Sequence, residues 1–194
     1  MKTIEEPRLE SDLVYRFEFL AEFIGFTPAD ASAVQAIGPF LGPMIPQIVE
    51  RTYEKLLAFD ATARHFVDRQ SGFEGQVPAS LAEIDANHPQ IKFRKEHLQR
   101  YLTQILTKPC DAKMVPYLDM VGKIHTTHAG NSKIEVPIVQ MNALMGMLSD
   151  LLIETISDAP IDSARALKSI RALTKLLWIQ NDFINRHYQV EPTG

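Results

Sequence analysis

Two histidines in one predicted helix are the residues best suited to bind a metal or a cofactor. Leu118, Val121, His125 and His128 follow one another at steps of three, four and three residues, which places both imidazoles on the apolar face of a helix over residues 114–128. A histidine in this position is most often a structural residue bonded to a carbonyl group. The other interpretations are a haem-iron ligand and a zinc ligand, and zinc is disfavoured because no second cysteine or nearby carboxylate cluster supplies the remaining ligands.

Tyr53 is the second residue whose side chain could take part in a binding site. It lies four residues after Val49 and three before Leu56, so its ring faces inward or to the edge of a buried helix face. A buried tyrosine needs a hydrogen-bond partner for its hydroxyl group. Tyr53 is therefore either a core residue bonded to the backbone or a donor directed into a pocket opposite His125.

The motifs of several common enzyme classes do not occur in the sequence. It has no glycine-rich dinucleotide or phosphate loop, no Gly-x-Ser-x-Gly and no His-Glu-x-x-His. It also has no Glu-x-x-His pair of the kind that binds di-iron centres. The only cysteine, Cys110, is expected to be an ordinary thiol, and we do not expect an enzyme.

The composition narrows the class of protein further. The chain has 194 residues, 45% of them hydrophobic, and a net charge of −4, which is enough apolar material for one core and argues against a nucleic-acid-binding surface. No apolar run reaches the roughly 18–20 residues of a membrane span, and the first seven residues lack the apolar centre of a signal peptide. A cytoplasmic protein is expected, without a nucleic-acid or membrane partner.

Apolar residues recur at helical spacing along nearly the whole chain, so the predicted fold class is all-α. Residues 1–10 are expected to form an N-terminal tail, and residues 11–190 a single domain whose leading helix covers 11–24. The second helix is expected to stop near Gly38-Pro39. The one long irregular connection covers residues 67–87. About eight helical segments are expected, over residues 11–24, 28–38, 43–59, 60–66, 89–106, 114–128, 137–157 and 162–188.

Three segments resemble parts of known haem proteins. The stretch from Tyr117 to His125 looks like the proximal-histidine helix of protoglobins and globin-coupled sensors, where an apolar-Gly-x-x-His pattern supplies the iron ligand. Residues 52–57 and 60–66 are similar to their B helix and the turn after it. In those families a distal tyrosine is followed thirteen residues later by an aromatic that packs on the porphyrin, and Tyr53 and Phe66 have this spacing. Leu98 falls where they carry an apolar distal residue, and the resemblance covers roughly residues 12–188.

The resemblance implies a globin fold with an extra N-terminal helix, binding haem b through His125, Tyr53, Phe66 and Leu98. His125 would be the proximal iron ligand, and Tyr53 would stabilise O₂, CO or NO bound on the opposite side. The implied function is a gas sensor or gas-binding protein. Helices 137–157 and 162–188, whose apolar faces are wide, would form a homodimer interface. No length remains for an output module, so a signalling partner is expected in another chain.

Several alternatives stay open at this level. His128 competes with His125 as the iron ligand, and His97 is either a solvated residue or a sixth ligand. Thr52 stands where protoglobins commonly carry a tryptophan, so a less crowded pocket is expected. Two other functions also remain, namely a haem-free globin-fold domain for dimerisation or signalling, and a haem enzyme such as a peroxidase or NO scavenger.

Overall fold

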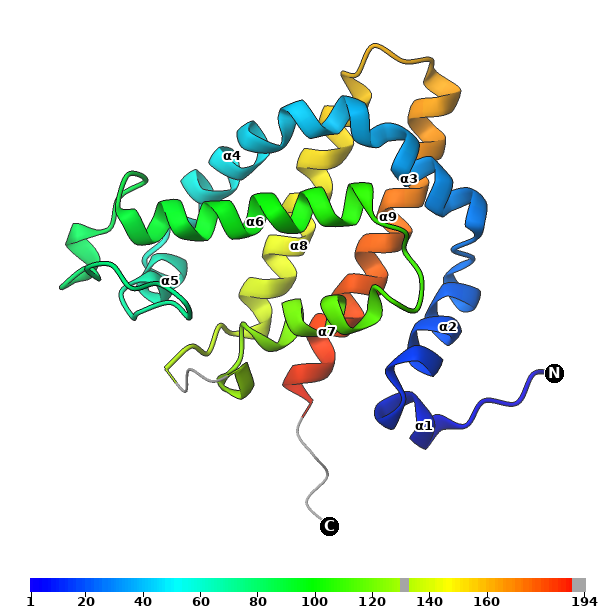
Figure 1. The fold of residues 1–194 in the computed structure, drawn as a ribbon, viewed down its shortest axis with the longest axis horizontal. Coiled ribbons are helices and arrows are strands. Elements are labelled where there is room, and N and C mark those ends of the chain that lie inside the picture. Colours follow the sequence, from blue (N-terminus) through cyan, green and yellow to red (C-terminus); the bar gives the residue numbers. More distant parts are fainter. Residues whose placement is uncertain (130–132, 190–194) are drawn as a thin grey trace.

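The chain folds into packed helices (Figure 1). The structure, a computed structural model, describes residues 1–129 and 133–189. These residues contain no strand, which confirms the all-α class, and each of the eight expected segments contains a helix. The helices are α1 Glu6–Ser11, α2 Leu13–Ile24, α3 Pro28–Leu41, α4 Ile45–Leu57, α5 Asp60–Ala63, α6 Pro89–Thr107, α7 Val115–Lys123, α8 Ile138–Ser157 and α9 Ser163–Asn185.

One further helix, α1, begins where the sequence predicted a tail, so that prediction is wrong for residues 6–10. Charged side chains hold α1 in position. Arg8 forms an ion pair with Asp12 at 2.9 Å, and the buried Arg16 donates to the carbonyl oxygen of Leu9 while pairing with Asp182 of α9 at 2.5 Å. A buried guanidinium needs such partners, and the bonds that Arg16 forms hold the segment before α2 in place.

Helix α3 also runs further than the sequence predicted. It begins at a capping box, in which Thr27 and Asp30 bond reciprocally. It then continues through Pro39 to Leu41 instead of stopping near Gly38-Pro39. Ile37 and Leu41, one turn apart, are both fully buried, and their burial outweighs the hydrogen bond that the proline removes.

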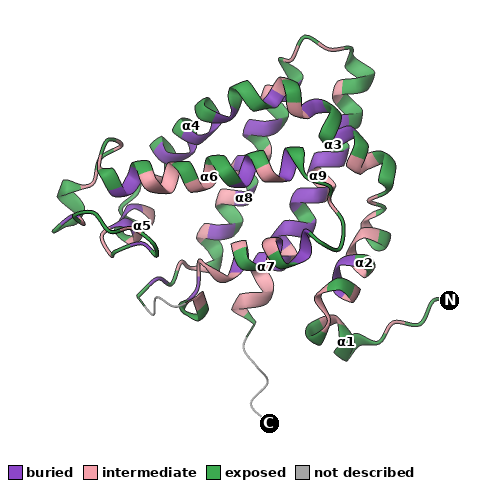
Figure 2. Ribbon diagram, in the orientation of Figure 1, coloured by how far each residue is buried: buried purple, intermediate pink, exposed green. Residues whose placement is uncertain are grey.

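The long helices α8 and α9 pack side by side, and both contact α3. Helices α4 and α6 pack together on this layer, while α7 packs on α9 and α2 contacts both α7 and α9 (Figure 1). The inner faces of these helices are buried and the outer faces exposed (Figure 2). Residues 67–87 form an irregular connection beside α5, with one short 3₁₀ turn at Leu81–Glu83.

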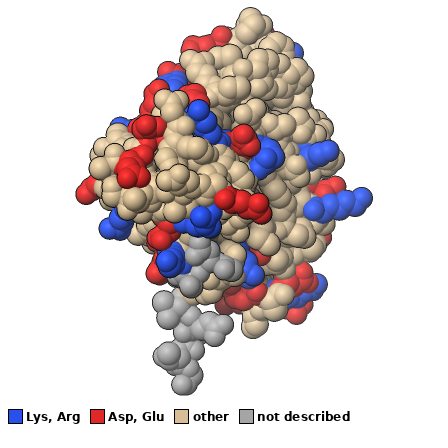
Figure 3. Space-filling model, turned by 60° about the vertical axis from the view of Figure 1, so that its left-hand side comes forward, with Lys and Arg blue, Asp and Glu red and all other residues tan. Residues whose placement is uncertain are grey.

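The surface carries charges of both signs. Figure 3 shows lysine and arginine side chains interspersed with aspartate and glutamate over one face of the molecule. Among the helices formed by residues 1–129 and 133–189, none is both long and apolar enough to cross a membrane.

Candidate functional site

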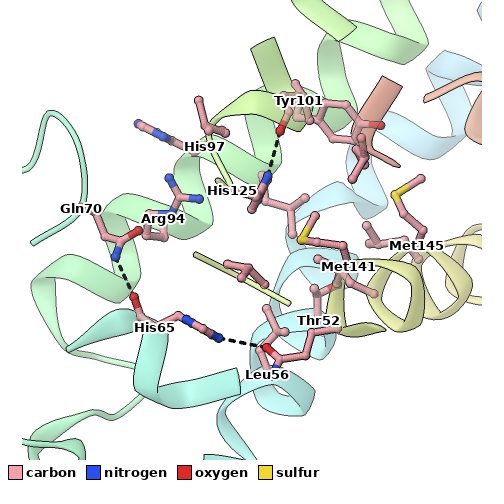
Figure 4. Close-up of a pocket in the computed structure, with 18 of the residues that line it drawn as sticks. Thr52, Leu56, His65, Gln70, Arg94, His97, Tyr101, His125, Met141 and Met145 are labelled. Carbon is pink, nitrogen blue, oxygen red and sulfur yellow. Dashed lines mark hydrogen bonds between the residues drawn. The ribbon is translucent and has the colours of Figure 1, made fainter. Parts of the chain in front are cut away.

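A cavity of about 440 Å³ lies between α4, α6, α7 and α8, within the size range of small-molecule sites (Figure 4). All four residues predicted for the site line it, namely Tyr53, Phe66, Leu98 and His125. They come from four separate segments of the chain. Two lining residues, Arg100 and Met120, are exposed, so the cavity reaches the surface between α6 and α7.

The helix before His125 ends earlier than the sequence predicted. Helix α7 stops at Lys123, so neither His125 nor His128 lies on a continuous helix face, and the expected helix end at residues 130–131 lies outside the described residues. The backbone N–H of His125 donates to Gly122 at 3.2 Å, a tighter turn than an α-helix makes. The carbonyl oxygen of Val121 is thereby available to the His125 ring, whose Nδ1 lies 2.7 Å away.

This hydrogen bond fixes the state of the imidazole. With Nδ1 donating to a carbonyl oxygen, Nε2 carries the free lone pair. Burial, followed by the positive charge of Arg94, lowers the pKa of His125 to about 4, although the bond to Val121 partly opposes the shift. The ring is therefore neutral near pH 7, which is the form that binds metals. The carbonyl oxygen of His125 also accepts the N–H of Val136 at 2.9 Å, which anchors this segment to the start of α8.

Tyr53 and Phe66 meet on another wall of the cavity. Their ring centroids are 5.7 Å apart and tilted at 45°, so the thirteen-residue spacing brings the two aromatics into contact. Burial raises the pKa of Tyr53 to about 12, and the positive charge of Arg94 partly opposes this shift. Tyr53 is therefore a neutral hydroxyl at physiological pH. The neighbouring Thr52 also lines the cavity and donates its hydroxyl to Ile48 at 2.7 Å.

The two competing histidines lie in different places. His128 is exposed and does not belong to the cavity lining, so the geometry favours His125. His97 does line the cavity, with its ring 4.3 Å from that of Phe93. Burial and the charges of Arg94 and Arg100 lower the pKa of His97 to about 4.

Several lining residues were missed from the sequence. Arg94 lies one helical turn before Leu98, a spacing that could have identified it. His65 bonds to Gln140 of α8 at 3.0 Å, and Gln70, from the 67–87 connection, donates to the carbonyl oxygen of His65 at 2.8 Å. Met141 and Met145 supply much of the apolar wall (Figure 4). The contact between His65 and Gln140 joins segments 75 residues apart, and no local pattern indicates it.

The cavity fits a flat apolar cofactor whose metal takes one protein ligand. Residues 1–129 and 133–189 hold no group of three or more His, Cys, Asp or Glu side chains that could bind a metal by themselves. The neutral ring of His125 lines a mostly apolar cavity with an aromatic wall, which suits a metal carried in a macrocycle. Around the cavity, Arg94 Nε and the Tyr101 hydroxyl are buried without a hydrogen-bond partner in the described structure, so polar atoms remain for a bound group.

Comparisons with known proteins agree with this fold. The globin domain of a globin-coupled sensor from Geobacter sulfurreducens superposes with a TM-score of 0.70, covering 89% of this chain and 97% of that one at 16% identity, which shows the globin fold. A search of curated protein sequences gave no match. The protoglobin family model matches residues 13–193, nearly the whole chain. The chain therefore belongs to the protoglobin family.

Proposed function

We propose that this globin domain binds haem b through His125 and holds a diatomic gas at the iron. The observation that carries the proposal is the pairing of His125 Nδ1 with the carbonyl oxygen of Val121 at 2.7 Å. It leaves a neutral Nε2 for the cavity and fixes the ring orientation, as partners of metal-binding histidines do. Family membership supports the same cofactor.

When bound, haem supplies an iron at which O₂, CO or NO can bind. The chain's own residues then determine the polarity of the cavity and the access of ligands and water to it. Tyr53 offers a neutral hydroxyl donor on the wall formed by α4, and Phe66 and Leu98 keep water out of the cavity. Met141 and Met145 offer soft apolar contact surface to the macrocycle. We assign the site to binding and not to catalysis.

Haem uptake tests the proposal directly. The purified chain, supplied with excess haem, is expected to show a Soret absorption band and one haem per chain, and His125→Ala is expected to lose most of both. His128→Ala is the matched control, because it removes an exposed imidazole outside the cavity. A wild-type chain that takes up no haem, or equal loading of both variants, would contradict the proposal.

We further propose a homodimer through the outer faces of α8 and α9. Most of the apolar residues that suggested this interface are buried within the chain itself, among them Met145, Leu152 and Leu177. An outer stripe remains, in which Val139, Leu167 and Trp178 are 69%, 58% and 63% exposed. Exposed apolar side chains on two adjacent long helices are typical of an association surface.

Signalling would then require ligand binding to shift α7 relative to α9. The two helices are in close contact, since a Cβ on Gly122 would lie 2.8 Å from the Cα of Ile184. Asp119 of α7 also pairs with Arg186, just after α9, at 2.6 Å. This contact would connect the His125 segment to the dimer helices, and we expect a cytoplasmic partner chain to receive the signal.

A further inference from the structure

The backbone of Val136 connects His125 to the chain that follows α9. The N–H of Val136 donates to the carbonyl oxygen of His125 at 2.9 Å. The carbonyl oxygen of Val136 accepts the hydroxyl of Tyr188 at 2.7 Å. Both His125 and Val136 line the cavity. Tyr188 is thus linked to the backbone of His125 through a single residue.

The carbonyl oxygen of Val136 lies before the hydrogen-bond ladder of α8, which begins at the carbonyl oxygen of Pro137. A backbone carbonyl inside a protein needs a donor, and Tyr188 supplies one. Burial, followed by the negative charge of Glu135, raises the pKa of Tyr188 to about 12. The hydroxyl therefore keeps the proton that it donates near pH 7.

The turn that contains Tyr188 also holds the helix before His125. Asp119 of α7 accepts bonds from Arg186 at 2.6 Å and from His187 at 2.9 Å. Arg186, His187 and Tyr188 form the 3₁₀ turn that directly follows α9, and Figure 1 shows the end of α9 beside α7. This turn therefore contacts the chain on both sides of His125.

Support from outside the helix matters because α7 stops at Lys123, before His125. A residue inside an α-helix takes its position from the hydrogen-bond ladder, whereas a residue past the helix end depends on other contacts. The bond of the His125 ring to Val121 is local and turns with the end of α7. The bond from the Val136 N–H comes from the start of α8, so it fixes the His125 backbone relative to that helix.

We propose that Tyr188 is a positioning residue for His125. Its hydroxyl holds the Val136 backbone, which in turn sets where the imidazole stands in the cavity. The inference rests on the proposed haem function, because the iron would report the position of the ring. Since α9 also carries the exposed Trp178 of the proposed dimer surface, the same link connects the cavity to that surface.

Tyr188→Phe tests the link, because it removes only the hydroxyl. Tyr15→Phe is the matched control, since the Tyr15 hydroxyl also forms a hydrogen bond, from the Glu5 N–H at 3.1 Å, but lies on α2 outside the cavity lining. In the ferrous, haem-loaded proteins, resonance Raman spectra are expected to show a shifted or broadened iron–histidine stretching band for Tyr188→Phe alone. Haem transfer to excess apomyoglobin is expected to be about three- to tenfold faster from Tyr188→Phe, as loss of one neutral hydrogen bond implies, and to stay within about twofold for Tyr15→Phe.

An iron–histidine band that stays at its wild-type position in Tyr188→Phe would overturn the proposal, as would equal shifts in both variants. A loss of unfolding free energy without a band shift would mean that Tyr188 only stabilises the fold. If Tyr188→Phe does not fold, as judged by its helical circular dichroism, amide hydrogen exchange of the wild-type chain replaces it. Haem is then expected to slow exchange of the Val136 N–H by about tenfold or more, because coupling between the two is reciprocal, and equal rates would overturn the proposal.

The outcomes for this inference and for the proposed function are distinguishable. A wild-type chain that takes up no haem overturns both together. Normal haem loading of the wild type and of Tyr188→Phe, with an unchanged iron–histidine band, overturns the role of Tyr188 alone.

Discussion

The Nδ1 atom of His125 lies 2.7 Å from the carbonyl oxygen of Val121, the oxygen that an uninterrupted α-helix would pair with the backbone N–H of His125. The helix tightens at its end, and that N–H donates to Gly122 instead. One change in backbone pairing therefore gives the imidazole its tautomer, its orientation and its access to the cavity.

The burial of His125 is expected to make the stability of the haem-free protein depend on pH. Its pKa is about 4 when folded, against an ordinary value of 6.5. The unfolded chain therefore binds more protons between these values, and the stabilisation is present above about pH 6.5 and is lost as pH falls toward 4. Urea unfolding at pH 7 and pH 5 measures this loss. His125→Phe is expected to reduce the difference in unfolding free energy between the two pH values by about 1 kcal/mol or more. An unchanged difference would show that His125 does not cause the loss of stability.

Tyr53→Phe is expected to release O₂ about tenfold faster from the haem-loaded protein, with little change for CO. The substitution removes only the hydroxyl and keeps the ring contact with Phe66. Bound O₂ accepts a hydrogen bond more strongly than CO, and such a bond contributes about 1–3 kcal/mol in a dry pocket. Flash photolysis and stopped-flow mixing give the rates. Equal changes for both gases would show that the hydroxyl does not contact the ligand.

Gly122→Ala is expected to destabilise the fold by about 2–4 kcal/mol. Its Cβ would meet the backbone of Phe183 and Ile184, which cannot move without separating α7 from α9. Gly42→Ala is the control, because a Cβ there has no atom within 4 Å and the backbone is helical. Urea unfolding measures both variants. Equal stabilities would mean that the contact between α7 and α9 is looser than the structure indicates.

Trp178→Glu is expected to shift the protein from dimer to monomer, because it places a charge in the exposed stripe of α9. Leu81→Glu is the control, since Leu81 is 39% exposed and lies in the connection of residues 67–87, not on α8 or α9. Light scattering coupled to size-exclusion chromatography measures the mass of each variant. A monomeric wild-type chain, or a dimer that survives Trp178→Glu, would exclude this interface.

The helices themselves could largely be predicted from the sequence. Thr27 and Asp30 start α3 as a capping box, and α4, α6, α8 and α9 appear within a few residues of their predicted bounds. The prediction failed at Pro39 because contacts between distant segments outweighed the local signal, and it failed after Lys123 because a local side-chain hydrogen bond took the place of a backbone one. Ile37 and Leu41 hold α3 together by burial, and α7 gives up its last turn so that His125 can bond to Val121.

The residue types and spacings determined the fold class, and the resemblance to protoglobins then indicated four of the residues that line the cavity. Tyr53 and Phe66 could be paired because their spacing matches that of the family, and His125 could be selected because the residues before it match the family's pattern. Only the tertiary structure brought Arg94, His65 and Met141 to the same cavity and placed His128 outside it. The physical reason is that helical periodicity determines which face of a helix is buried, whereas the packing of separate helices determines what that face meets.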